Sequence, residues 1–180
     1  MRIISGSHKG KSIAAPKSLP VRPTTDFAKE ALFNILENNF YMDDVKVLDL
    51  FCGTGNISYE FASRGASSIT SVDQHFGCVG FTKKTARELS FNSIHCVKND
   101  VFKFLKQHSQ PYDIIFADPP YDLKNIADLV QLVFENNWLH DNGWLIIEHD
   151  KRTDLSEYPH FFRQRKYSNV NFSIFKNLSD

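Results

Sequence analysis

From residue 45 to residue 148 the chain alternates short apolar runs with segments whose apolar residues recur at helical spacing. The apolar runs are rich in Val, Ile, Leu and Phe, which is typical of strands buried on both faces. Strands that alternate with helices of this length form βαβ units with a parallel sheet. The pattern therefore predicts an α/β fold with a doubly wound, Rossmann-like sheet.

The expected elements follow one another closely along the chain. We expect parallel strands at 45–50, 68–72, 94–97, 113–117 and 144–148, and helices between them at 57–63, 77–89, 101–106 and 125–134. An amphipathic helix capped by Thr25 precedes them, from Asp26 to about Asn39. Adjoining strands at 160–165 and 169–176 indicate an antiparallel C-terminal hairpin at the sheet edge. These strands together predict a seven-stranded sheet.

The first 25 residues differ in composition from the rest of the chain. They contain no acid and five cations, Arg2, Lys9, Lys11, Lys17 and Arg22. β-prone stretches at 2–5 and 10–14 flank a glycine-containing loop, which predicts a small hairpin, and three prolines follow in a linker. We expect a basic N-terminal β-hairpin and linker over 1–22 and a single larger domain over 23–180. Such a basic run is either a solvated arm or a contact for nucleic-acid phosphates.

The composition excludes several other classes of protein. A chain of 180 residues, with 21 cations and 21 acids, buries roughly 70% of the surface that its unfolded form exposes. No apolar run is long enough to span a membrane, and no apolar segment follows the basic N-terminus as in a signal peptide. The three cysteines, Cys52, Cys78 and Cys96, are odd in number and have no CxxC spacing, which argues against both a disulfide framework and a zinc site. We therefore expect a reduced, cytoplasmic protein with no metal and no membrane association.

A glycine turn follows the first expected parallel strand, in the segment Asp-Leu-Phe-Cys-Gly-Thr-Gly at 49–55. In doubly wound sheets, ligands bind outside the carboxyl ends of the strands, and glycines there let the backbone approach a ligand closely. Asp49, Phe51, Gly53 and Gly55 are therefore candidate cofactor-binding residues. Helix-to-strand packing is the alternative role for such a turn.

Two acids follow at the ends of the next two strands. Asp73 lies 18 residues after Gly55, where a carboxylate can accept hydrogen bonds from both hydroxyls of a ribose. This spacing suits NAD as well as S-adenosylmethionine, but Ser58 stands where a third glycine would approach a pyrophosphate. Asp100 and the backbone N–H of Val101 are candidates for binding an adenine. Helix capping is the alternative role for Asp100.

The tetrapeptide Asp118-Pro119-Pro120-Tyr121 follows the fourth expected parallel strand. Its prolines fix φ and lack backbone donors, so the turn is stiff and presents carbonyl acceptors. An exocyclic amine is a poor nucleophile because its lone pair is delocalised. If Asp118 and a proline carbonyl hold its two N–H groups, the lone pair can point at a sulfonium methyl, while Tyr121 offers a flat face to the substrate ring. A plain strand-ending turn is the alternative.

With these motifs in order, the chain resembles the class I S-adenosylmethionine-dependent methyltransferases that act on amines. Over nearly its whole length it resembles the RsmD family, through the segments 2–6, 22–26, 30–34, 49–55 and 63–66. The resemblance implies methyl transfer from S-adenosylmethionine to guanine N2 in 16S rRNA, with that RNA or a small ribosomal subunit particle as partner. It also implies that Gly53 and Gly55 line the cofactor, Asp73 holds its ribose, Asp100 its adenine, and 118–121 the guanine.

The chain departs from the family pattern in places. Phe27 and Lys29 stand where basic residues, often arginines, are usual, and Asp73 stands where Glu is more usual. Glu148, after the fifth parallel strand, matches a family acid, but we expect it to be a structural partner. The alternatives are a methyltransferase acting on a protein glutamine or a DNA adenine, a non-catalytic RNA-binding module that retains the fold, and a nicotinamide oxidoreductase. We expect a monomer.

Overall fold

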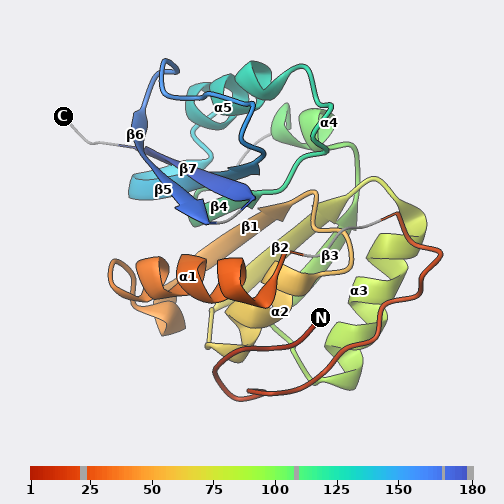
Figure 1. Cartoon of the computed structure of the whole chain (residues 1–180). Helices are drawn as coiled ribbons and strands as arrows, with labels where there is room; N and C mark the ends of the chain where they lie inside the picture. Colours follow the sequence, from red (N-terminus) through yellow and green to blue (C-terminus); the bar gives the residue numbers. More distant parts are fainter. Residues whose placement is uncertain (21–23, 108–109, 168, 178–180) are drawn as a thin grey trace.

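The structure, a computed structural model, describes residues 1–20, 24–107, 110–167 and 169–177. Within these ranges one sheet has the strand order β3-β2-β1-β4-β5-β7-β6 (Figure 1). The strands are β1 Lys46–Leu50, β2 Ser68–Asp73, β3 Ile94–Lys98, β4 Tyr112–Ala117, β5 Leu139–His149, β6 Phe161–Tyr167 and β7 Val170–Lys176. Strands β1 to β5 are parallel, and β7 pairs antiparallel with both β5 and β6. The predicted seven-stranded Rossmann-like sheet with an antiparallel C-terminal hairpin is confirmed.

Helices cover both faces of this sheet. They are α1 Asp26–Glu37, α2 Asn56–Ser63, α3 Phe76–Glu88, α4 Val101–Leu105 and α5 Ile126–Glu135, with a short 3₁₀ helix η1 at Met42–Asp44. The Thr25 hydroxyl accepts a hydrogen bond from the Ala28 N–H at 3.2 Å and caps α1, as the sequence predicts. The chain leaves β1 for β2 on one side, whereas β4 lies on the other side. A crevice at the carboxyl ends of β1 and β4 follows from this change of direction.

The core has a layer on each face of the sheet. Helices α1 and α2 pack on one face, where the rings of Phe33 and Phe61 meet at 4.6 Å between centroids. Helices α4 and α5 pack on the other face, around buried Leu105 and Leu129. Each fully buried side chain of this size contributes roughly 1.5–3 kcal/mol. These two layers fix the strands whose carboxyl ends carry the predicted site.

The N-terminal arm, residues 1–20, folds back on itself with less regular pairing than the predicted hairpin. Its two sides are antiparallel, with the Ile3 N–H donating to the Lys11 carbonyl at 2.9 Å, but Arg2 and Ser12 form a single bridge outside any named strand. The reason is that the next two backbone N–H groups, of Ile4 and Ser5, donate to the Glu60 carboxylate on α2. The arm is thereby attached to the helix layer instead of forming a longer ladder.

Strand β5 begins five residues earlier than the apolar run 144–148 predicts. Leu139 pairs with Tyr112, and the register then shifts before Ile114 pairs with Trp144. The residues between are polar, with Asn142 at φ 62°, so no periodic pattern marks this part of the strand. In the described part of the chain, no helix is both long and apolar enough to cross a membrane.

Candidate functional site

A cavity of about 650 Å³ lies at the carboxyl ends of β1, β2 and β4. This volume falls in the range of roughly 300–1,000 Å³ that small-molecule sites occupy. The predicted site residues that line it are Asp49, Phe51, Gly53, Asp73, Asp118, Pro119, Pro120 and Tyr121. The fold therefore brings the glycine turn and the Asp-Pro-Pro-Tyr turn, about 65 residues apart in the chain, to one cavity.

The turn after β1 has an unusual backbone. Phe51, Gly53 and Gly55 all have positive φ, at 59°, 52° and 81°. For Phe51 this left-handed conformation costs roughly 1–2 kcal/mol, and such strain is concentrated at functional sites. A Cβ on Gly55 would lie only 2.7 Å from the Tyr59 ring and 2.8 Å from Thr82. Gly55 therefore has a packing role and does not line the cavity, whereas Gly53 does.

Asp49 is a buried acid on β1, with 1% of its surface exposed. The Ser58 hydroxyl donates a hydrogen bond to it at 2.5 Å, and Ser58 lies 2.7 Å from the Ser71 hydroxyl. Burial raises the pKa of Asp49 to about 7, although the Ser58 hydrogen bond opposes the rise. A cation bound in the cavity would favour the ionised form. Ser58 stands where a dinucleotide-binding turn would have a glycine, and here its hydroxyl orients Asp49.

Asp73 ends β2 and faces the cavity. One carboxylate oxygen accepts a hydrogen bond from the Gly53 N–H at 2.9 Å, and the other accepts from the His75 N–H at 2.8 Å. An ionised carboxylate offers about four acceptor positions, so two such bonds leave capacity for a ligand. Asp73 therefore shapes the glycine turn, and its binding of a ribose stays a prediction.

Asp100 and Val101 are not among the residues that line the cavity. The Asp100 carboxylate accepts a hydrogen bond from the Lys103 N–H at 2.9 Å and caps α4. Val101 is 3% exposed and belongs to the core layer with Leu105. The capping role that the sequence leaves open for Asp100 is therefore present in the structure.

The Asp-Pro-Pro-Tyr turn is held beside β1, because the Asp118 N–H donates to the Leu50 carbonyl at 3.4 Å. Pro119 is buried and Pro120 is exposed. Burial, followed by the negative charges of Glu148 and Asp49, holds the pKa of the Asp118 carboxyl well above its ordinary value. Tyr121 is 43% exposed, which leaves part of its ring accessible at the cavity.

A series of buried polar contacts, which the sequence does not predict, lies next to this turn. The Thr24 hydroxyl donates to Glu148 at 2.9 Å, and the Asn56 amide donates to the Thr24 carbonyl at 3.2 Å. Lys29 in turn donates to the Asn56 side-chain oxygen at 2.9 Å. Thr24 and Asn56 also line the cavity. Buried polar networks make a structure rigid when their members are hydrogen-bonded. These hydrogen bonds therefore fix the cavity wall to α1.

Lys29 and Glu60 form a buried ion pair at 3.3 Å, with 1% and 0% of their side chains exposed. Burial lowers the pKa of Lys29, and the charge of Glu60 opposes that effect. Glu60 also accepts from Arg64 at 2.8 Å. The sequence does carry a signal, because Lys29 shares its helix face with Leu32 and Leu36, so a cation stands at an apolar position. The Lys29 ammonium also donates to the Arg2 carbonyl at 2.5 Å, so Lys29 connects α1, α2 and the arm and is not exposed to a partner.

The predicted RNA-binding residues occupy different positions. Lys9, Lys11 and Lys17 are exposed. Arg2 is exposed and forms an ion pair with Asp26 at 3.1 Å. Arg22 lies outside the described residues. Within the described ranges, no group of three or more His, Cys, Asp or Glu side chains is arranged to hold a metal ion.

Comparisons with known proteins identify the family of this chain and proteins of the same fold. The family model described as conserved hypothetical protein 95 matches residues 1–176. Ribosomal RNA small subunit methyltransferase D from Buchnera aphidicola subsp. Baizongia pistaciae is 30% identical over 184 residues, which cover 100% of this chain and 93% of that protein.

Solved structures share the fold. The protein yhhF from Escherichia coli has a TM-score of 0.88 and 26% identity, covering 100% of this chain and 99% of that one. The Thermus thermophilus 16S rRNA N2 G1207 methyltransferase, solved with AdoMet and guanosine, has a TM-score of 0.73 and 19% identity, covering 88% and 45%. The chain belongs to the family described as conserved hypothetical protein 95, which is the RsmD family.

Proposed function

We propose that this protein transfers a methyl group from S-adenosylmethionine to the exocyclic N2 of a guanine in the 16S rRNA of the small ribosomal subunit. The observation that carries the proposal is the single cavity shared by the glycine turn and the Asp-Pro-Pro-Tyr turn. A cofactor on the first turn and a base on the second would meet inside it. The family relationship to rRNA methyltransferases supports the same class of substrate.

The charges of the cavity suit a cationic cofactor. Asp49, Asp73 and Asp118 line it, and among the described residues no Lys or Arg does. S-adenosylmethionine carries a sulfonium and an ammonium group, which such carboxylates attract, whereas the pyrophosphate of NAD would be repelled. In this proposal Phe51 and Gly53 bring the backbone close to the cofactor and Asp49 lies near its cationic part.

The adenosine part of the cofactor lies along the ends of β2 and β3 in this proposal. Asp73 accepts hydrogen bonds from the ribose hydroxyls, and Gly55 completes the turn. Asp100 and the Val101 backbone bind the adenine, with Asp100 using the acceptor capacity that remains beside its cap to α4. The sulfonium supplies the electrophilic methyl group.

The target amine binds at the second turn. Asp118 and a proline carbonyl of Pro119 or Pro120 accept its two N–H groups, which directs the nitrogen lone pair toward the methyl group. Positioning supplies most of the acceleration, because well-oriented pairs reach effective molarities of about 10⁵ M or more. The proton leaves to water once the new bond has formed. Tyr121 stacks on the guanine and offsets part of the few kcal/mol that unstacking the base costs.

The arm and linker, 1–22, contact RNA in this proposal, and 23–180 form the catalytic domain. The exposed Lys9, Lys11 and Lys17 meet phosphates, which adds affinity without sequence preference. Arg2 and Arg22 belong to the same basic segment. We place the protein in the cytoplasm, acting as a monomer on the ribosomal RNA or on a small-subunit particle.

The experiment is methyl transfer to purified small-subunit particles from cells that lack the protein. The purified enzyme is incubated with them and isotopically labelled S-adenosylmethionine, and the RNA is digested to nucleosides for mass spectrometry. The proposal predicts label on guanosine, with the methyl group on N2. Label on another atom, on ribosomal protein glutamine, or only on a DNA substrate offered in parallel would contradict it. An Asp118→Asn variant prepared identically controls for contaminating methyltransferases.

A further inference from the structure

A cluster of cations and aromatic rings lies on the C-terminal hairpin, far along the chain from the basic arm. The Arg163 guanidinium lies 5.3 Å from the Trp144 ring centroid and 5.0 Å from that of Phe162. The Lys176 ammonium lies 3.9 Å from the Phe162 centroid and 5.0 Å from that of Trp144. Arg165 follows on the same strand. We call Trp144, Phe162, Arg163, Arg165 and Lys176 the hairpin patch.

Strand pairing places these cations on one face of the sheet. Arg163 pairs with Ile174, and Arg165 pairs with Phe172. Because paired residues point to the same face, and because Ile174 and Phe172 belong to the core layer under α1, both arginines lie on the face that α1 covers. Lys176 follows Ile174 by two residues, so its side chain lies on that face too.

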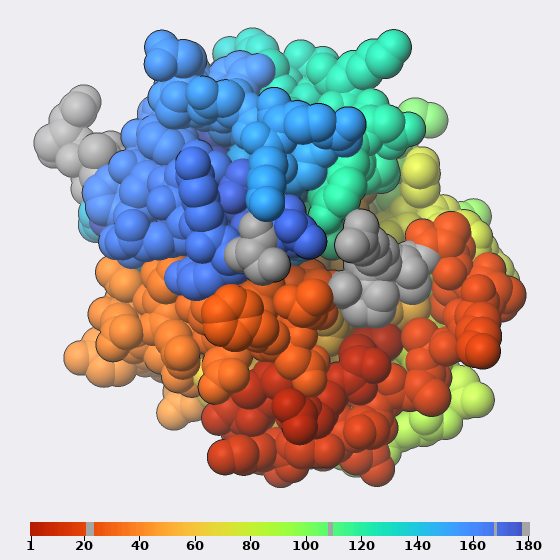
Figure 2. Space-filling model, in the orientation of Figure 1, coloured from red at the N-terminus to blue at the C-terminus, as the bar shows by residue number. Residues whose placement is uncertain are grey.

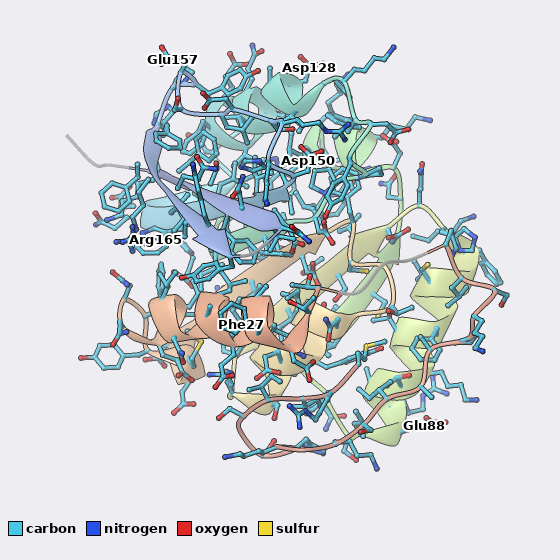
Figure 3. The ribbon with its side chains drawn as sticks, in the orientation of Figure 1. Phe27, Glu88, Asp128, Asp150, Glu157 and Arg165 are labelled. Carbon is cyan, nitrogen blue, oxygen red and sulfur yellow. The ribbon has the colours of Figure 1, made fainter. Side chains whose placement is uncertain are left out.

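The patch continues over α1 toward the arm. Phe27 of α1 is 64% exposed and meets the Tyr167 ring at 6.2 Å between centroids. Figure 3 shows Phe27 and Arg165 on the side of the molecule that faces the viewer. Figure 2 shows the arm in red, α1 in orange and the hairpin in blue on this one face. The patch and the arm therefore flank α1, whose N-terminal end leads to Thr24 in the cavity wall.

The cations of the patch lack acidic partners. Residues 158–177 contain no Asp or Glu. In the described part of the chain, none of Arg163, Arg165 and Lys176 forms an ion pair. Arg163 also has a buried Nε with no hydrogen-bond partner among the described residues. Burial and the nearby charge of Arg165 lower the pKa of Arg163, which indicates cations crowded together.

Among the described residues, the remaining charges near the hairpin form no ion pair with the patch. Lys166 pairs with Asn171 and directly follows Arg165 in β6, so its side chain points to the opposite face of the sheet. Hydrogen bonding from Ser156 is the main cause that lowers the pKa of Asp154, and the charge of Lys166 adds to that effect. On α1, Asp26 pairs with Arg2, and Glu37 pairs with Arg64 at 2.6 Å. The third acid of α1, Glu30, is exposed and forms no ion pair with the patch among the described residues.

We propose that the hairpin patch is a second RNA-binding surface, which contacts phosphates through Arg165 and Lys176 and stacks a base on Phe162. Phe162 is 44% exposed, so its ring is accessible beside these cations. Cations that track a backbone, interleaved with aromatic rings, are typical of surfaces that bind single-stranded nucleic acid, and arginine also suits phosphate geometry. The inference rests on the proposed function, because RNA is the polyanion that this enzyme would methylate. With the arm, the patch would hold RNA on both sides of α1.

The test compares two double variants that each remove one arginine and one lysine. The first is Arg165→Ala with Lys176→Ala, and the control is Arg87→Ala with Lys103→Ala, from exposed positions on α3 and α4. The probe is a fluorescein-labelled RNA hairpin with a guanine-containing single-stranded loop, followed by anisotropy from about 50 to 200 mM salt. Each phosphate contact on a single strand contributes about 0.7 to the slope of log affinity against log salt concentration. One such contact therefore makes the affinity at 0.1 M salt roughly fivefold higher, relative to the affinity at 1 M salt, than it would be without the contact.

We expect the patch variant to bind this RNA more than tenfold more weakly at 0.1 M salt, with a salt slope lower by about 1.4, while the control binds like the wild type. The charge-retaining variant Arg165→Lys with Lys176→Arg should restore the slope. Phe162→Leu should weaken binding without changing the slope, because stacking releases no counterions. Binding of S-adenosylmethionine, measured by calorimetry, should be unchanged in every variant.

Two outcomes would separate the failure of this inference from that of the proposed function. If the patch variant keeps the affinity and slope of the wild type while the wild type binds RNA and methylates guanine N2, the patch is not an RNA surface and the proposed function stands. If the wild-type enzyme binds S-adenosylmethionine but neither binds nor methylates RNA, both are wrong. Loss of binding in the control variant as well would also overturn a specific role for the patch.

Discussion

The Thr24 hydroxyl donates a hydrogen bond of 2.9 Å to the Glu148 carboxylate, which joins residues 124 positions apart in the chain. Thr24 lines the cavity, and Glu148 is buried next to the last residue of β5. After burial, the charge of Glu148 is the largest cause of the raised pKa of Asp118. Glu148 therefore acts on the proposed amine-binding carboxylate through its charge, besides fixing the cavity wall.

Replacing Glu148 by Gln should move the acidic limb of the kcat/KM profile to lower pH. The reason is that Asp118 acts in its ionised form in the proposed mechanism, and removal of a neighbouring negative charge lowers its pKa. Gln keeps an oxygen that can accept the Thr24 hydroxyl, so the packing is preserved. The measurement is methyl transfer to RNA as a function of pH. An unchanged limb, or a limb moved to higher pH, would mean that Glu148 does not act on Asp118 in this way.

Asp73→Ala should weaken the binding of S-adenosylmethionine by about 1.5–3 kcal/mol, the range for a lost hydrogen bond to a charged group. Part of this loss comes from the Gly53 N–H, which Asp73 holds in the turn. Asp73→Asn is the matched control, because its side-chain oxygen can still accept from Gly53 while the charge is gone. Calorimetric titration measures both variants. Wild-type affinity in Asp73→Ala would show that the ribose assignment is wrong.

Tyr121→Phe should leave turnover nearly unchanged, and Tyr121→Ala should reduce kcat/KM by tenfold or more. Stacking of a base on an aromatic ring is worth about 1–3 kcal/mol and needs the ring, not the hydroxyl. The measurement is steady-state methylation of RNA, with cofactor affinity as the control for folding. If Tyr121→Phe is the more damaged of the two, the phenol takes part in proton transfer instead.

The double variant Lys9→Ala with Lys11→Ala should bind RNA with a shallower dependence on salt, by about 0.7 to 0.9 per lysine. Both side chains are exposed on the arm, where they can reach phosphates. Lys103→Ala with Lys106→Ala, at exposed positions of the α4 region, is the control of equal charge. A slope equal to that of the wild type would leave the arm as a solvated segment.

The sequence predicts most of the fold because the information is local. The alternation of apolar runs and helical spacing identifies each strand from β1 to β4 to within a residue or two, and Thr25 marks the start of α1. No apolar run marks the start of β5, because Leu139 is held in the strand by its pairing with Tyr112 and not by its neighbours in the sequence.

The site is predictable where a motif occupies a strand end and less so where distant segments meet. The Asp-Pro-Pro-Tyr turn and Asp73 line the cavity as their positions at strand ends indicate. By contrast, the contact of Thr24 with Glu148 joins parts of the chain that no local pattern relates. The attachment of the arm to Glu60 is likewise a contact between distant segments that no local pattern predicts. It makes the pairing within the arm shorter than its β-prone sequence suggests.

In the proposed mechanism, the Asp118 turn binds the amine while the glycine turn binds the cofactor. The most direct measurement is a comparison of Asp118→Ala with the wild type, in which single-turnover methylation of RNA and calorimetric affinity for S-adenosylmethionine are determined on the same preparations. Asp118→Ala should lose nearly all turnover while its cofactor affinity changes little. Substantial turnover in this variant, or a loss of turnover that is explained by lost cofactor binding, would contradict this mechanism.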